Sequence, residues 1–154
     1  MGLEGATKSN NIELIDFFID KGANDFNNPL LISSKKGNIK LVDFFIDKGA
    51  NDLNQAMAQA AKENQKEMVD HLIQKGADDF KLGLVGAASG GNLEMFKHIV
   101  KEAKGIEVSK NFFTHVLSRR VNDGKIGLIE TVNGERKYDE VSNYINEITN
   151  KLFS

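Results

Sequence analysis

The motif Lys-Gly-Ala-Asn-Asp stands at Lys21–Asp25 and again at Lys48–Asp52, and its variant Lys-Gly-Ala-Asp-Asp stands at Lys75–Asp79. Successive copies begin 27 residues apart. The same period reaches the start of the chain, because Gly2–Leu14 aligns with Gly83–Met95 at an offset of 81 residues, or three periods. A fixed period of this length indicates a repeat protein, in which one small unit is stacked several times.

Each unit is predicted to contain two short helices. The second helix is the clearer, because the apolar residues of Asn38–Ala50 follow the spacing of an amphipathic helix. The Lys-Gly-Ala ending is typical of a helix C-terminus, where lysine is favourable and glycine readily takes the left-handed conformation. The equivalent second segments are Asn11–Ala23, Gln65–Ala77 and Asn92–Lys104, and the first helices are expected at Asn28–Lys36, Gln55–Glu63 and Lys81–Gly90.

Two small residues stand together at the same place in every first helix. Small side chains allow neighbouring helices to approach closely. The sequence therefore predicts an all-α solenoid of helix pairs that touch along their first helices. The small pairs are Ala6-Thr7, Ser33-Ser34, Ala60-Ala61 and Ala87-Ala88.

The repeated motifs resemble those of the ankyrin repeat family from about Gly2 to Val100. Where that family has Thr-Pro-Leu-His-x-Ala-Ala and then Gly-His-x-Glu, this chain has Asn28-Pro29-Leu30-Leu31-Ile32-Ser33-Ser34 and then Gly37-Asn38-Ile39-Lys40. Ankyrin units are ~33 residues long, so these units are about six residues short. The missing residues fall where an ankyrin unit has its β-hairpin finger, so the resemblance implies an ankyrin-like solenoid with shortened or absent fingers.

The shortened links carry a large apolar residue in every unit: Phe26, Leu53 and Phe80. We expect these side chains to pack between stacked repeats. Finger-less units in which Gly-Ala-Asn-Asp is followed by an aromatic residue and asparagine also resemble the divergent ankyrin arrays of giant DNA viruses of amoebae. The resemblance would make this chain a viral protein that acts on a host factor.

The chain is expected to form a single ankyrin-repeat domain over residues 1–154. Repeats are predicted at about 1–25, 26–52, 53–79 and 80–106, with a divergent repeat at 107–133 and a C-terminal capping helix at 137–153. At the start, Glu4 occupies a place that is apolar in later units, which suits a capping repeat. The other interpretation is a fragment cut from a longer array.

The register lapses after Val100. Further helices are predicted at Val108–Val121 and Lys125–Val132, followed by a turn at Asn133-Gly134. Tyr138–Phe153 has apolar residues at spacings of three and four, so it is expected to form an amphipathic helix. We predict that this helix caps the last repeat, and the alternative is a helix that docks on a partner.

Composition excludes several classes of function. The formal net charge is −2, which argues against a protein that depends on phosphate contacts with nucleic acid. The absence of cysteine excludes disulfides and thiolate nucleophiles. No apolar run approaches the ~18 residues of a membrane span, and the first residues lack the features of a signal peptide. A cytoplasmic location is expected, which would be the host cytoplasm for a viral protein.

No catalytic, cofactor or metal site is predicted. His71 and His98 stand one period apart and could share a metal ion, but the two earlier repeats have phenylalanine at this position. A ring packed at a repeat interface is therefore the preferred interpretation. The aspartates of a neighbouring column are predicted to lie on the solvated face of the second helices: Asp16, Asp43 and Asp70.

The sequence argues against two further activities. A weak basic stripe is interrupted by Glu63 and has no interleaved aromatic residues, which argues against nucleic-acid binding. Its members are Lys8, Lys35, Lys36, Lys62, Arg119 and Arg120. An enzyme in the region Gly105–Ser154 would need a catalytic group, and the candidate side chains there show no motif spacing: His115, Arg119, Arg120, Glu130 and Asp139. The chain is predicted not to be an enzyme.

The first helices and the links before them are expected to form one continuous concave surface. The frame repeats while the exposed positions vary, as at the equivalent residues Ile32, Gln59 and Gly86. This pattern favours a protein-binding module that is a monomer, and the alternative is a structural protein whose arrays stack end to end. The residues predicted to contact a partner are Asn27, Asn28, Lys35, Lys36, Asn54, Gln55, Gln59, Lys62, Glu63, Lys81, Ser89 and Gly90.

Overall fold

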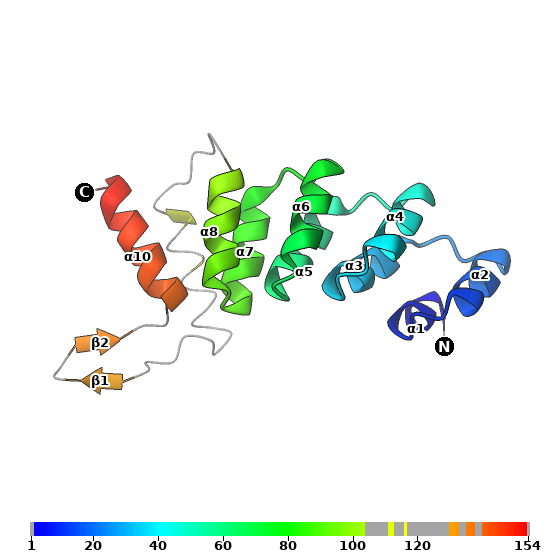
Figure 1. The fold of residues 1–154 in the computed structure, drawn as a ribbon, viewed down its shortest axis with the longest axis horizontal. Coiled ribbons are helices and arrows are strands. Elements are labelled where there is room, and N and C mark those ends of the chain that lie inside the picture. The colour runs from blue at the N-terminus through cyan, green and yellow to red at the C-terminus, as the bar shows by residue number, and fades with distance from the viewer. Residues whose placement is uncertain are drawn as a thin grey trace.

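The structure, a computed structural model, describes residues 2–103, 111–112, 116, 130–132, 135–137 and 140–153. Over residues 2–103 the chain forms helix pairs that stand side by side in one elongated row (Figure 1). The helix-pair solenoid is confirmed, and the first helices of the second, third and fourth pairs begin one or two residues before their predicted starts. The pairs are α1 (Leu3–Lys8) with α2 (Ile12–Asp20), α3 (Asn27–Lys35) with α4 (Ile39–Asp47), α5 (Leu53–Lys62) with α6 (Lys66–Gln74), and α7 (Phe80–Gly90) with α8 (Leu93–Glu102).

The links between these pairs contain no strand: residues 23–26, 50–52 and 77–79 run directly into the next first helix. The β-hairpin fingers, predicted to be shortened or absent, are absent here. The second helices end as their sequence predicts. After α4, Gly49 takes a φ of +106°, and the N–H of Ala50 donates to the carbonyl oxygen of Phe45 at 2.9 Å. Glycine suits this left-handed position because it has no Cβ.

The core is continuous from repeat to repeat. The small pairs of the first helices are buried, and the hydroxyl groups of Thr7, Ser33 and Ser34 are satisfied by the carbonyl oxygen four residues earlier in the helix, each at 2.8 Å. Larger apolar side chains from both helices of each pair fill the remaining space. The fully buried ones include Ile15, Leu30, Phe45, Met57, Leu72, Leu84 and Phe96.

The apolar residues of the links pack as predicted. Phe26, Leu53 and Phe80 are half-buried against the core. The ring of Phe26 stacks on that of Phe45, with 6.4 Å between the ring centroids and 24° between the planes. Each shortened link therefore contributes one large side chain to the groove between neighbouring pairs.

The last helix, α10 (Glu140–Phe153), packs against α8 (Figure 1). Tyr144 meets Phe96 edge-on, with 6.1 Å between the ring centroids, and Ile145 is fully buried. The amphipathic terminal helix predicted over Tyr138–Phe153 is thus present from Glu140 onwards. Residues 138–139 lie outside the described residues.

Two short strands, β1 (Glu130–Val132) and β2 (Glu135–Lys137), pair antiparallel before α10, with Thr131 opposite Arg136. The helix predicted over Lys125–Val132 is therefore wrong at its last three residues. The reason is local: an Asn-Gly dipeptide between two short runs favours a hairpin, because its backbone twist suits antiparallel strands. Asn133 and Gly134 lie outside the described residues.

Of the helix predicted over Val108–Val121, the structure describes Asn111, Phe112 and Val116. These residues are helical, and Val116 is buried. The candidate catalytic side chains His115, Arg119, Arg120 and Asp139 lie outside the described residues, as do residues 117–129 of the predicted divergent repeat.

Candidate functional site

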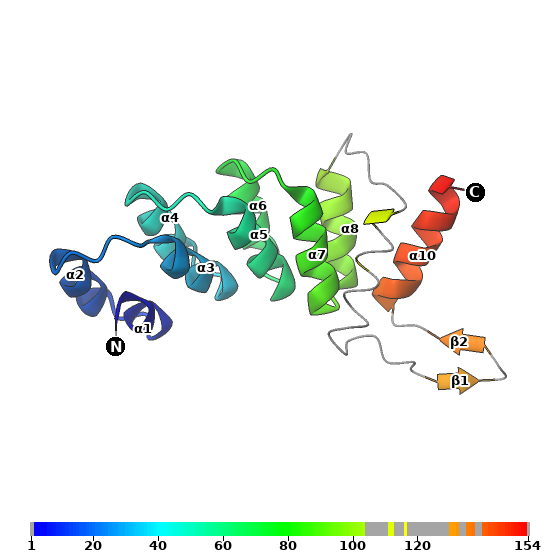
Figure 2. The same cartoon turned by 180° about the vertical axis from the view of Figure 1, so that it is seen from behind.

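The first helices α1, α3, α5 and α7 form a continuous row in which each helix packs on the next (Figures 1 and 2). The second helices make much less contact with one another along the row. A stack that is tighter on one side curves toward that side, so the first helices line the inner, concave surface. The exposed side chains of this row are the natural candidates for contact with another molecule.

The predicted partner-contacting residues divide into two groups by exposure. Seven have exposed side chains on the first helices or at their ends: Asn28, Lys35, Lys36, Gln55, Lys62, Glu63 and Lys81. The other five are half-buried: Asn27, Asn54, Gln59, Ser89 and Gly90. Of the three equivalent positions that were predicted to vary on the exposed face, Ile32 and Gln59 are half-buried, and Gly86 is buried.

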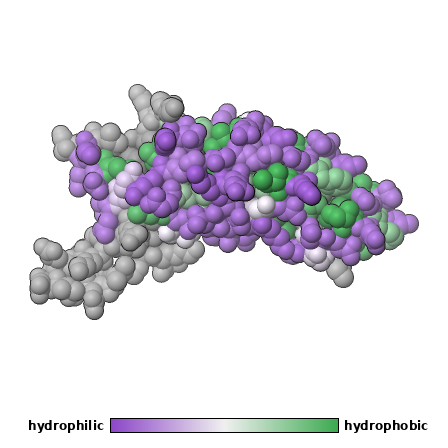
Figure 3. Space-filling model, in the orientation of Figure 1, coloured by the Kyte–Doolittle hydropathy of each residue, from purple (hydrophilic) through white to green (hydrophobic). Residues whose placement is uncertain are grey.

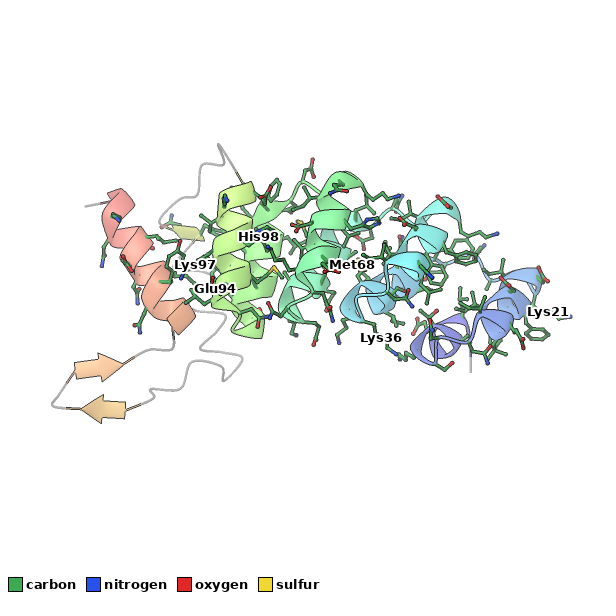
Figure 4. All side chains as sticks on the ribbon, in the orientation of Figure 1. Lys21, Lys36, Met68, Glu94, Lys97 and His98 are labelled. Atoms are coloured by element: carbon green, nitrogen blue, oxygen red, sulfur yellow. The ribbon has the colours of Figure 1, made fainter. Side chains whose placement is uncertain are left out.

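A hollow of about 390 Å³ opens where α1, α3 and α5 end. Its lining is basic with one carboxylate and one apolar side chain: Lys8, Lys35, Lys36, Glu63 and Ile32. Lys36, labelled in Figure 4, extends toward α1, and its ammonium group donates to the backbone oxygen of Lys8. Lys35 lies 3.8 Å from Glu63 of the next repeat. The structure thus brings together residues of three repeats that the sequence places 27 or 28 residues apart.

Asn27 and Asn54 each bind the link that follows their own helix pair. The Oδ1 atom of Asn54 accepts hydrogen bonds from the backbone N–H groups of Asp78 (2.8 Å) and Asp79 (3.0 Å), and its Nδ2 atom donates to Asp78 Oδ1 at 3.2 Å. Asn27 makes the same three contacts with Asn51 and Asp52. Both amides were predicted to contact a partner, but their hydrogen-bonding groups are occupied by the following link. The equivalent residue in the fourth repeat is Lys81.

Replacing Asn54 by alanine is expected to lower the free energy of unfolding by about 1 kcal/mol, because two backbone N–H groups lose their acceptor but remain accessible to water. Urea unfolding followed by far-ultraviolet circular dichroism measures the loss. Gln55→Ala is the control, since the exposed side chain of Gln55 is adjacent in the chain, and its removal should change stability by less than about 0.5 kcal/mol. Equal effects of the two substitutions would contradict a clamping role for Asn54.

Glycines bring the backbones of α5 and α7 into direct contact. A Cβ built on Gly86 would lie 2.2 Å from the carbonyl oxygen of Ala58, and one built on Gly90 would lie 2.1 Å from that of Lys62. Gly90, predicted to face a partner, therefore packs on the end of α5. The variation seen at Gly86 has the same cause, because a larger side chain does not fit between the two helices.

The second helices are joined by polar contacts that sequence analysis missed. His71 Nε2 lies 2.8 Å from Asp43 Oδ1, and Lys75 Nζ lies 2.8 Å from the same oxygen. His98 repeats the first contact with Asp70 at 2.5 Å and points from α8 toward α6 in Figure 4. The aspartate column is therefore not simply solvated, since Asp43 and Asp70 each bind a residue of the next repeat. The histidines combine the predicted packing with a polar contact.

A change of pH should reveal the ion pair at Asp43. The hydrogen bond from Lys75 lowers the pKa of Asp43 below its usual range, and contacts with His71 add to this effect, whereas desolvation opposes it. Because the pKa is lowered, ionised Asp43 stabilises the fold at pH values above the ordinary pKa of about 4. This stabilisation is lost as the pH falls through the lowered pKa. Asp43→Asn should therefore cost stability near neutral pH, and this cost should shrink progressively as the pH falls below about 4.

The expected loss at neutral pH is only about 0.5 kcal/mol, because the Asp43 side chain is 37% exposed and solvent screens the pair. Unfolding in urea at a series of pH values measures the difference between the two proteins. Asp16→Asn is the control, since Asp16 occupies the same column but the next repeat offers Phe44 in place of a histidine. A constant difference between wild type and Asp43→Asn across the acid range would contradict the assignment.

The described residues contain no cluster of side chains that could hold a metal ion, because histidine, aspartate and glutamate side chains form no group of three in this part of the chain. Among the described helices, none is long and apolar enough to cross a membrane. The site is thus a repetitive polar surface on packed helices.

Comparison with known families agrees with this architecture. A family model of ankyrin repeats, comprising three copies, matches residues 3–81. The chain belongs to the ankyrin repeat family. No curated protein matches the chain in sequence. The match covers the first three helix pairs of this ankyrin protein, and its fourth pair, α7 and α8, continues the same row.

Ankyrin repeats are generally protein–protein interaction modules, and the family is typically non-catalytic. The comparisons found no catalytic domain in this chain. Membership of the family therefore supports a function in binding other proteins, and the surface that does so has to be argued from the residues of this particular array.

Proposed function

We propose that this ankyrin protein binds a partner protein along the concave surface formed by α1, α3, α5 and α7. The observation that supports this proposal most directly is the row of exposed polar side chains on a frame of buried small residues. The central contacts would come from Asn28, Gln55, Gln59 and Lys81. The hollow at the helix ends would add Lys35, Lys36 and Glu63, and the end of α5 would add Lys62. Ser89 and Gly90 lie at the end of the same row.

The absence of fingers supports a partner that lies close to the helices. In a unit with a β-hairpin, the hairpin extends the concave surface beyond the helix ends. Here the links are short and are held to the preceding repeat by Asn27 and Asn54. The binding surface is therefore flatter than in a unit with a hairpin, and side-chain differences between repeats supply its specificity.

Site-specific photo-crosslinking tests the proposal. A benzophenone amino acid placed at Gln55, on the concave surface, should give a discrete adduct with a partner in extracts of the source cell. The same amino acid at Glu67, an exposed residue of the second helix α6, is the control and should give none. Adducts that form equally from both positions, or only from Glu67, would contradict the proposal.

We also propose that the partner is a host protein in the cytoplasm and that this chain is viral. The support is the repeat signature, Gly-Ala-Asn-Asp followed by an apolar residue and asparagine, together with the finger-less links. Fluorescence microscopy of the tagged protein in amoebal cells tests the location. Accumulation in the nucleus or on the cell surface would contradict it.

For the domain organisation, we propose four repeats over about residues 1–25, 26–52, 53–79 and 80–106, followed by a divergent region at 107–133 and a capping helix at 137–153. The contact of Tyr144 with Phe96 and the burial of Ile145 support the capping role of α10. Removing residues 138–154 should lower the melting temperature and expose the apolar face of α8. An unchanged melting temperature would contradict the capping role.

A second candidate function is self-association through the outer face of α2. Ile12 and Phe17 are each 50% exposed there, and a groove of about 300 Å³ lies between α2 and α4. Apolar patches are visible over α4 and α2 toward the right of Figure 3. Light scattering over a range of concentrations distinguishes the two functions. A monomer at all concentrations would contradict self-association, and a dimer that dissociates in Phe17→Ser would support it.

A further inference from the structure

Lysines at one repeat-equivalent position form a column across the concave surface. Lys8, Lys35 and Lys62 are the last residues of α1, α3 and α5, and they stand 27 residues apart. All three side chains are exposed. Because neighbouring first helices pack on each other, this lysine column (Lys8, Lys35 and Lys62) runs without interruption across three repeats.

The positive charge of the lysine column is only partly balanced. Lys35 faces Glu63 at 3.8 Å, but both side chains are about half exposed, so the pair is weak. Lys8 and Lys62 form no ion pair with any residue in the described part of the chain. The ammonium group of Lys36, held at the backbone oxygen of Lys8, adds a further positive charge beside the column.

Helix stability accounts for each lysine separately but not for the whole arrangement. A lysine in the last turn of a helix is favourable because it meets the negative end of the helix dipole. This effect does not explain why two lysines of the column, Lys8 and Lys35, border a hollow of about 390 Å³ together with Lys36. Ile32 supplies apolar surface in this hollow. A basic rim beside a hollow with an apolar wall is a surface that suits an acidic peptide.

The spacing of the column sets the form of that peptide. Packed helices lie ~8–10 Å apart, so successive lysines of the column are separated by about this distance. A polyproline II segment rises ~3.1 Å per residue with three residues per turn, which places every third side chain on one face at intervals of ~9 Å. Acidic residues at every third position of such a segment would therefore meet one lysine per repeat.

We infer that the partner of this protein presents an extended acidic segment, with a carboxylate at every third residue, to the lysine column. This inference rests on the proposed function, since it names the kind of partner that the concave surface binds. The partner's carboxylates would meet Lys8, Lys35 and Lys62 in turn, and an apolar side chain between them would contact Ile32.

Titration of the full, isotope-labelled chain with synthetic peptides tests the inference by nuclear magnetic resonance. The probe is a peptide of repeated Glu-Pro-Pro triplets, and its neutral control is a peptide of Gln-Pro-Pro triplets. A third peptide has the composition of the probe but contiguous glutamates. Binding of the probe should shift the amide signals at residues 8–9, 35–36 and 62–63. It should be at least about tenfold tighter than that of the neutral peptide, and the advantage should shrink with added salt.

Substitutions in the protein complete the test. Lys35→Gln and Lys62→Gln should each weaken binding of the probe about two- to fivefold, as expected for an exposed ion pair, whereas Lys62→Arg should preserve it. Lys40→Gln is the matched control, because Lys40 is an exposed lysine of the same repeat as Lys35 but lies on the second helix α4. Circular dichroism verifies that each variant is folded.

Several results would overturn the inference. Equal affinity for the acidic and neutral peptides, or no binding of the probe, excludes an acidic segment. Equal affinity for the peptide with contiguous glutamates excludes the proposed spacing. Tighter binding of single-stranded polyuridylate than of the probe would assign the column to nucleic acid. If crosslinking from Gln55 captures a partner without an acidic segment, this inference fails and the proposed function stands. If there is no adduct from Gln55, the proposed function itself fails.

Discussion

Replacing Gly86 by alanine is expected to lower the free energy of unfolding by about 2 to 3 kcal/mol, which is typical of overpacking in a well-packed core. The new methyl group would lie 2.2 Å from the carbonyl oxygen of Ala58 and 2.9 Å from its carbonyl carbon. Because these are backbone atoms of a neighbouring helix, the contact can be relieved only by moving α7 away from α5. Such a movement would loosen the buried small residues along both helices.

The control for this prediction is the same substitution one turn earlier in α7. A Cβ on Gly83 would lie 3.3 Å from the terminal methyl group of Met57, a flexible side chain that can move. Gly83→Ala should therefore be neutral, or stabilising by up to about 1 kcal/mol through the higher helix propensity of alanine. Urea unfolding of both variants measures the difference. Equal stabilities would show that the backbones of α5 and α7 are not in direct contact.

Replacing Phe45 by alanine is expected to cost about 3 to 5 kcal/mol, the usual range for deleting a buried phenylalanine ring. Phe45 is fully buried, and its ring stacks on Phe26 of the preceding link. Removing it leaves a cavity between two repeats and takes away the surface on which the link packs. In a stack where each repeat is stabilised by its neighbours, this loss should also weaken the first repeat.

The adjacent residue supplies the control. Phe44 is half-buried on the same helix, with its ring edge-on to Phe45 at 5.3 Å and beneath the ammonium group of Lys48 at 5.5 Å. Phe44→Ala should cost less, about 1 to 2 kcal/mol, because part of this ring already lies in water and its removal leaves no enclosed cavity. Urea unfolding compares the two variants, and hydrogen exchange shows where protection is lost. Similar losses of stability in the two variants would contradict the difference in burial between Phe45 and Phe44.

Local patterns account for the helices that sequence analysis predicted correctly. The apolar spacing in Asn38–Ala50 and the glycine that follows α4 act within a few residues, so they can be recognised without knowledge of the neighbours. The terminal hairpin shows the same dependence on local sequence. There, the Asn-Gly dipeptide after Val132 favours a hairpin, whereas the apolar residues before it favour a helix. The helix predicted over Lys125–Val132 is wrong at its last three residues, which form β1.

The exposure of the predicted site residues is harder to read from local sequence, because it depends on the packing of neighbouring segments. Asn54 is polar and follows a link, which suggests a surface residue, yet its amide is bound to the next link, 24 and 25 residues ahead. The histidine–aspartate contacts of the second helices join residues 28 apart, one more than the period. Comparison of equivalent positions therefore places Asp43 and Asp70 in one column. It does not reveal that each of these aspartates contacts a histidine of the next repeat.

The sequence by itself determined the repeat, the helix pairs and the loss of the fingers, since a 27-residue period leaves no room for a hairpin. Only the tertiary structure decided which polar residues of the concave side remain open to a partner. The physical reason is close packing between segments distant in the sequence, which places the Asn54 amide against the link that follows its helix pair and the backbone of Gly86 against that of Ala58. The same stacking leaves Lys8, Lys35 and Lys62 exposed in one column at the ends of the first helices.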